Sequence, residues 1–153
     1  MKADEFEGAE GLAALRSRVT MPQPHIIQFF EVSRMSRTTV ARLWDRVDEF
    51  TANLPYWFML LDLSEMPNTP PNAQLRADLR DRFGKRRPEH AAVIAGKNHL
   101  LGVAAKFIMR SMLGGHKVTM HSSREDALAH LVNLAKEWEA ASLTRASVES
   151  RGV

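Results

Sequence analysis

Cysteine is absent from this chain of 153 residues. The absence excludes disulfide bonds, thiolate catalysis and metal sites with cysteine ligands, and it is compatible with a reducing compartment. Long apolar runs are lacking too, because residues 57–61 and 100–105 are far shorter than the roughly 20 residues that a membrane-spanning helix needs. The acidic start, residues 1–7, differs from the basic and then apolar start of a secretory signal. We therefore expect a cytoplasmic protein without a transmembrane helix.

A strong excess of charge of one sign is also missing, since 21 Lys and Arg face 18 Asp and Glu. The densest basic run is formed by Arg80, Arg82, Lys85, Arg86 and Arg87. Five cations fall short of the roughly 6–10 phosphate contacts that make strong, salt-sensitive DNA binding. We do not expect nucleic acid as a partner, and an anionic lipid surface matches this run better.

The apolar and charged fractions, 44% and 25%, are those of an ordinary globular domain. Sustained apolar periodicity is confined to the middle of the chain. We expect one domain at residues 11–140, with flexible tails at residues 1–10 and 141–153.

The periodicity within the domain alternates between strands and helices. Predicted strands cover residues 12–20, 25–32, 56–62, 90–96 and 116–121, with Pro22 and Pro24 breaking the chain between the first two. Predicted helices cover residues 36–54, 72–83, 99–113 and the segment from 122 or 123 onward. The order β-β-α-β-α-β-α-β-α predicts an α/β fold with a mostly parallel sheet flanked by helices, of doubly wound or split type.

The run 56–62 (YWFMLLD) has no polar alternation, which is typical of a parallel strand covered on both faces. We predict that it is the central strand. Trp57, Met59, Leu60 and Leu61 should then all be buried.

Three local segments, together with the order of elements, resemble STAS domains, and the SpoIIAA-like group among them. The segments are residues 60–64 (LLDLS), 92–96 (AVIAG) and 123–131 (SREDALAHL), and the likeness covers about residues 25–138. This group shares its broad shape with CRAL-TRIO lipid-transfer domains. The resemblance implies a non-enzymatic binding or regulatory module.

The phosphorylated turn of classical STAS antagonists has no close counterpart here. The corresponding stretch, residues 67–72 (PNTPPN), has Thr69 as its only hydroxyl. A phosphate on Thr69 would lie at a helix N-terminus, which favours anions. Thr followed by Pro is also a typical helix cap, and we expect Thr69 to be a cap rather than a phosphosite.

Ligands of parallel sheets bind beyond the carboxyl ends of the strands. The polar residues expected there, as ligand-binding candidates, are Asp62, Ser64, Lys97, Asn98, His99, His121 and Ser122. An enzyme would need His99 or His121 beside a nucleophile such as Ser64 or Ser122. We expect instead that Asp62 caps a turn and that no residue is catalytic. The histidine spacing suits no metal, and we expect no cofactor.

The helix 99–113 has apolar residues around most of its circumference. One packing face cannot use them all, so we expect an interface or lipid contact through Leu101, Ile108 and Met112. A homodimer is the first expectation for this surface. A protein partner, a small apolar molecule and an anionic membrane are the alternatives.

Overall fold

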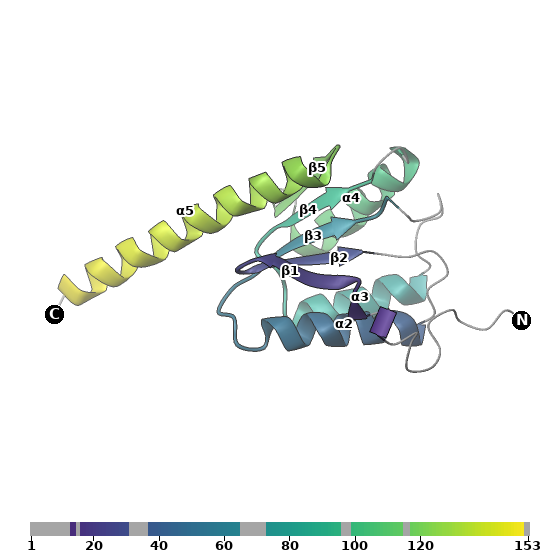
Figure 1. Cartoon of the computed structure of the whole chain (residues 1–153), viewed down its shortest axis with the longest axis horizontal. Helices are drawn as coiled ribbons and strands as arrows, with labels where there is room; N and C mark the ends of the chain where they lie inside the picture. Colours follow the sequence, from purple (N-terminus) through teal and green to yellow (C-terminus); the bar gives the residue numbers. More distant parts are fainter. Residues whose placement is uncertain are drawn as a thin grey trace, which may run out of the picture.

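The computed structural model describes residues 13–14, 16–30, 37–64, 73–95, 99–114 and 117–151. Within these ranges the chain forms a five-stranded sheet with the strand order β1-β2-β3-β4-β5 (Figure 1). The elements are β1 (Val19–Gln23), β2 (Ile26–Phe30), α2 (Arg37–Thr51), β3 (Phe58–Asp62), α3 (Ala73–Lys85), β4 (Ala91–Ile94), α4 (His99–Leu113), β5 (Val118–His121) and α5 (Arg124–Arg151). The predicted order of elements, and the α/β class with a mostly parallel sheet, are confirmed.

The edge strand β1 differs from its prediction. It starts at Val19 and runs through Pro22, while residues 13–14 and 16 are helical. Pro22 does not break the strand, because β1 is at the edge of the sheet. The outer side of an edge strand has no neighbouring strand, so a residue without an N–H costs no hydrogen bond of the sheet on that side. The turn into β2 places His25 at a φ of 67°, and β1 and β2 pair antiparallel.

The strands β2 to β5 are parallel, with β3 in the middle of the sheet. All five residues of β3 are buried, and Trp57 just before it is buried as well. The prediction of a central strand covered on both faces is confirmed.

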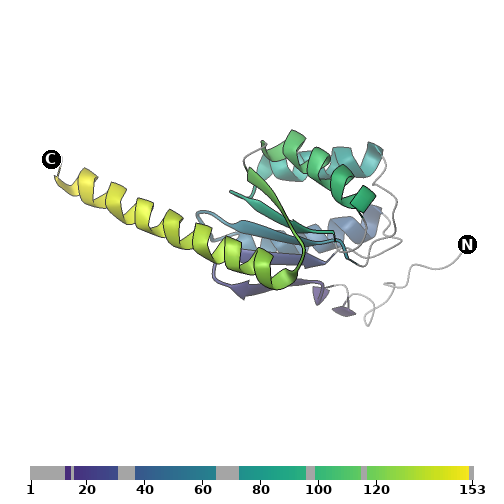
Figure 2. The ribbon, with the colours of Figure 1, turned by 90° about the horizontal axis from the view of Figure 1, so that it is seen from above.

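The helices α2, α3 and α4 connect successive parallel strands and lie on one face of the sheet (Figure 2). Trp44, Phe83 and Met109, one from each helix, share a buried apolar cluster with Phe29 and Leu61 of the sheet. Crossover connections between parallel strands are right-handed, and each of the three connections leads to the next strand in the same direction across the sheet. All three helices therefore lie on the same side of the sheet. The sheet is therefore wound on one face, not doubly wound.

The helix α5 covers the opposite face. Its residues Ala127 and Leu131 are fully buried in a second cluster with Ile26, Leu60 and Ile94. This single helix thus closes the core.

α5 continues well past the sheet and extends away from the body (Figure 1). Residues 139–148 are all exposed. We predicted a flexible tail from residue 141, and in the structure the helix runs to Arg151. A helix that packing has already nucleated is extended at little cost by residues such as Ala140, Ala141 and Leu143, which are good helix formers.

Candidate functional site

The carboxyl edge of the sheet brings together two of the predicted site residues. The register aligns Phe30, Asp62, Ile94 and His121 in one row across β2 to β5. Asp62 and His121 are therefore two strands apart, about 10 Å at the usual strand spacing. The two side chains share an edge of the sheet, and each is bonded to a near neighbour in the sequence, Asp62 to Ser64 and His121 to Thr119.

The carboxylate of Asp62 closes the turn that follows β3. Its Oδ1 accepts hydrogen bonds from the Ser64 backbone N–H at 2.9 Å and from the Ser64 hydroxyl at 2.5 Å. Asp62 is buried and Ser64 is exposed. This is the turn-capping geometry that aspartate favours.

His121 belongs to a group of three histidines between the sheet and α5. Its Nε2 lies 2.8 Å from the hydroxyl oxygen of Thr119, which lies 3.0 Å from Nε2 of His90. The His130 ring, on α5, is centred 5.1 Å from the His121 ring and 5.3 Å from the His90 ring. Burial lowers the pKa of His121, the electrostatic influence of the nearby His130 lowers it further, and Asp126 opposes the shift.

Sequence reasoning missed this histidine group. His121 and Thr119 are two residues apart on one strand and hence on one face, which the period of a strand predicts. His90 and His130 join them only through the strand register and the placement of α5.

The start of α5 is built from capping and buried polar contacts. The Ser123 hydroxyl accepts a hydrogen bond from the Asp126 backbone N–H at 3.2 Å, so Ser123 is the helix cap, and Ser122 is exposed. Arg124 donates from Nε to the side-chain oxygen of Gln28 at 2.9 Å. Gln28 and Arg124 were not among the residues predicted for this edge.

Three of the remaining predicted residues, Lys97, Asn98 and Thr69, lie outside the described residues, as does the side chain of His99. The part of the chain that the structure describes contains no group of three His, Asp or Glu arranged to hold a metal ion.

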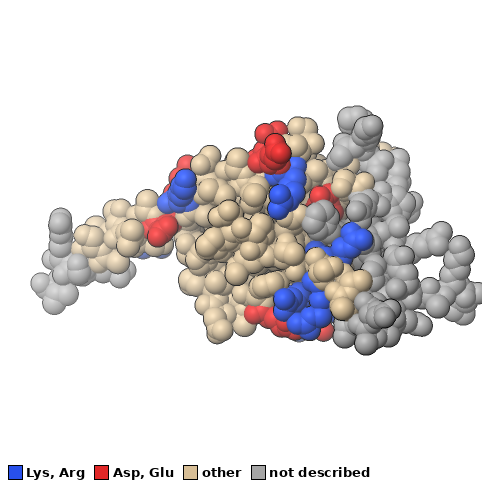
Figure 3. Space-filling view, in the orientation of Figure 1, with Lys and Arg blue, Asp and Glu red and all other residues tan. Residues whose placement is uncertain are grey.

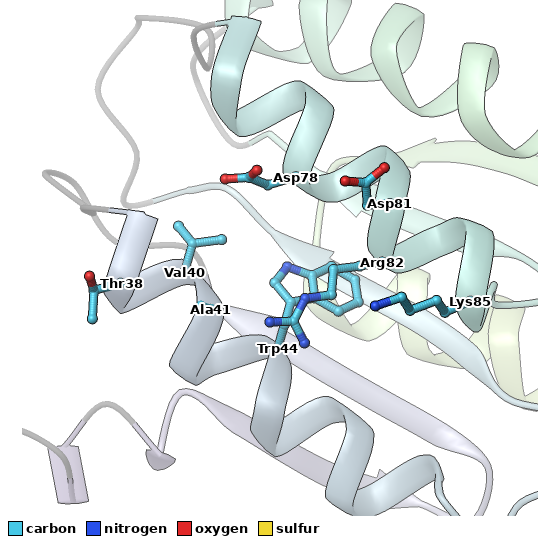
Figure 4. A pocket seen from close by; sticks show the side chains of 8 residues that line it. All are labelled: Thr38, Val40, Ala41, Trp44, Asp78, Asp81, Arg82 and Lys85. Atoms are coloured by element: carbon cyan, nitrogen blue, oxygen red, sulfur yellow. The ribbon is translucent and has the colours of Figure 1, made fainter.

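A pocket of about 670 Å³ lies between α2 and α3 (Figure 4). Trp44 and Val40 of α2 form its apolar side, and Arg82 of α3 reaches across it toward Trp44. Arg82 is paired with Asp45 at 3.3 Å and with Asp48 at 3.1 Å. The carboxylates near this guanidinium balance its charge, so the pocket has no clear preference for an anion or a cation.

The predicted basic run does not form a single patch. Besides the ion pairs of Arg82, Arg86 donates to the Leu54 carbonyl at 2.7 Å beyond the end of α2. Arg80 instead lines a groove beside α4. On the face shown in Figure 3, Lys and Arg side chains also appear in separate small groups.

Among the described residues of the domain body, the most exposed large apolar side chains lie on α4. Leu100, Val103 and Phe107 are 64%, 68% and 77% exposed. Their spacing of three and four residues places them on one side of the helix. The opposite side contains Ala105 and Met109, which are buried in the core.

The outward residues of α4 are thus different from those predicted. Ile108 and Met112 are half-buried, Met112 packs against the core cluster, and the side chain of Leu101 lies outside the described residues. The buried side is marked by Gly102, where a Cβ would lie 3.0 Å from the Cβ of Ala95. A glycine inside a helical pattern often marks such a close approach, and this signal could have located the exposed side.

Cationic residues flank this exposed side. Arg110, on α4, is exposed and Lys106 is half-exposed. On the other flank, Arg76 and Arg80 of α3 line a groove of about 410 Å³ between α3 and α4. We call Leu100, Val103 and Phe107, with Lys106 and Arg110, the α4 face.

Among the described residues of α3 and α4, the acidic side chains lie away from this surface. The sequence of α4 contains no Asp or Glu. Asp78 and Asp81 of α3 line the pocket toward α2, on the other side of their helix from Arg76 and Arg80.

Within the ranges described above, no helix has the length and apolar character needed to cross a membrane. Comparison with models of protein families, with curated proteins and with solved structures found no match to this chain.

Proposed function

We propose that this chain is a non-enzymatic binding or regulatory module of the STAS/SpoIIAA-like kind, that it acts in the cytoplasm, and that the α4 face is its working surface. The family assignment rests on segments 60–64, 92–96 and 123–131 and on the order of elements. The observation that carries the function is the exposure of Leu100, Val103 and Phe107 on one side of one helix. Monomeric proteins seldom leave such an apolar patch uncovered.

The contacts at the carboxyl edge of the sheet support a role without catalysis. A hydrolytic site of the kind considered from the sequence would need Ser64 or Ser122 beside His99 or His121. The Ser64 hydroxyl is bonded to Asp62, and His121 is bonded to Thr119. Both groups act within the fold.

A photo-crosslinking amino acid at position 103, introduced in the native host, tests this function. Position 148 is the matched control, because Val103 and Val148 are 68% and 64% exposed and Val148 lies on the projecting part of α5. We expect adducts from position 103 and few from position 148. A second copy, a protein partner or a small apolar molecule as the adduct would each identify the occupant. Equal, background-level labelling at both positions would refute the proposed working surface.

A further inference from the structure

The α4 face combines apolar and cationic side chains, and we propose that it docks the protein onto an anionic lipid bilayer. This inference rests on the proposed function, because it identifies the occupant of the same surface. It draws on the exposure, the charge and the position of α4 in the fold.

The apolar part of the face suits shallow insertion. Leu100 and Phe107 are seven residues apart, which is about 10 Å along a helix, and Val103 lies between them. All three are more than 60% exposed on one side of α4. A helix that lies in the plane of a bilayer buries such a row of side chains at the boundary between headgroups and acyl chains.

The charges around the apolar row match an anionic surface. Arg110 and Lys106 lie on α4 itself, and Arg80 is exposed on the adjacent flank of α3. Each cation near an anionic membrane surface strengthens binding by about 1 kcal/mol, or about five-fold. Because α4 has no acidic residue and the acids of α3 line the α2 side, little local repulsion opposes this attraction.

The same charges disfavour a second copy as the occupant. A two-fold contact through α4 would place the same surface of both copies face to face. Lys106 and Arg110 of each copy would then face cationic side chains of the other copy, and α4 has no acidic residue that could pair with them. Like charges brought together in an interface weaken it, whereas anionic lipid headgroups neutralise them.

The fold leaves the rest of the molecule free in this orientation. α4 and α5 cover opposite faces of the sheet (Figure 2). With α4 on the bilayer, the packed first half of α5, which includes Ala127 and Leu131, lies on the side of the sheet that faces away from the lipid.

Vesicle flotation of the full chain tests the proposal, with vesicles of phosphatidylcholine alone and of phosphatidylcholine mixed with phosphatidylglycerol. We expect the wild type to float with the anionic vesicles only, and to be released at high salt. Phe107→Glu and Leu100→Glu should each weaken binding by about ten-fold or more, because a buried apolar contact is replaced by a charge that the lipid repels. Leu143→Glu is the matched control, since Leu143 on α5 is 67% exposed and Leu100 is 64% exposed. It should bind as the wild type does.

A double variant, Arg80→Gln with Arg110→Gln, tests the charges separately. At about five-fold per cation, it should weaken binding to anionic vesicles by about 25-fold. Circular dichroism confirms that each variant is folded, and Phe107→Ser replaces Phe107→Glu should the latter lose helix content.

Three results would overturn the membrane proposal: no flotation of the wild type, equal flotation with neutral vesicles, or an equal loss of binding in Leu143→Glu. A dimer in sedimentation that Phe107→Glu dissociates, without vesicle binding, would assign the face to a second copy. Failure of flotation together with protein adducts from position 103 leaves the proposed function intact. Failure of flotation together with background labelling at position 103 would refute both the membrane proposal and the proposed function of the α4 face.

Discussion

Arg124, the first residue of α5, donates a hydrogen bond from Nε to the side-chain oxygen of Gln28 on β2 at 2.9 Å, across 96 positions of the sequence. Gln28 is only 1% exposed, so its amide lies within the apolar layer between α5 and the sheet. The bond therefore connects the last helix to a strand near the start of the domain and satisfies a polar group that water does not reach.

We predict that Arg124→Ala lowers the free energy of unfolding by about 1–3 kcal/mol, because it leaves the buried oxygen of Gln28 without a donor. The measurement is equilibrium unfolding in urea. Gln28→Met in the same background should recover most of the loss, since an apolar side chain needs no partner there. A change below about 0.5 kcal/mol in Arg124→Ala would show that the bond contributes little.

The histidine group predicts a pH dependence of stability. Burial and His130 lower the pKa of His121 below its ordinary value of 6.5, so the folded protein holds a proton on His121 less readily than the unfolded chain does. The contribution of His121 to the free energy of unfolding is fully present above about pH 6.5, and it is lost as the pH falls through the pKa of His121 in the folded state. The temperature of thermal unfolding, measured from about pH 8 down to about pH 5, should fall as the pH is lowered. In His121→Gln this fall should be smaller. An unchanged pH profile in His121→Gln would assign the loss to other groups.

Two glycines in helices should respond in different ways to alanine. Nothing lies within 4 Å of a Cβ at Gly84, so Gly84→Ala should stabilise the protein by about 0.5–1 kcal/mol through higher helix propensity. At Gly102 a Cβ would lie 3.0 Å from the Cβ of Ala95. Gly102→Ala should therefore stabilise the protein less than Gly84→Ala does, or destabilise it. Urea unfolding of both variants compares them directly. An equal gain at both positions would mean that α4 moves away from the sheet at no cost.

The turn after β3 provides a test of the structural role of Asp62. Asp62→Ala removes the acceptor of both bonds from Ser64 and should lower the free energy of unfolding by about 1–3 kcal/mol. Asp62→Asn keeps an oxygen at that position and should lose less. Should both variants keep wild-type stability, Asp62 would be free for a role in ligand binding.

Much of the fold could be predicted from local patterns. The uninterrupted apolar run of β3 indicated burial on both faces. The limits of α4 at residues 99 and 113 were predicted from Asn98, a typical helix cap, and from Gly114 and Gly115, which commonly end a helix. The predicted bounds of β1 were wrong, and the continuation of α5 to Arg151 was not predicted. The reason is that the tolerance for Pro22 depends on β1 being at the edge, and the extension of α5 depends on its docked first half.

The candidate surfaces were less accessible to sequence reasoning. The apolar excess of α4 was evident from its composition, but the side that faces outward was not. That side depends on the rotation of the helix about its own axis. In the observed rotation Gly102 faces the body of the domain and lies close to Ala95.

The sequence by itself determined the order of strands and helices and the burial of the central strand, because these follow from the polarity of residues a few positions apart. Only the tertiary structure decided that His90, Thr119, His121 and His130 lie together, and that Leu100, Val103 and Phe107 are left uncovered. These relationships depend on strand register and helix rotation, which arise from the packing of segments far apart in the chain.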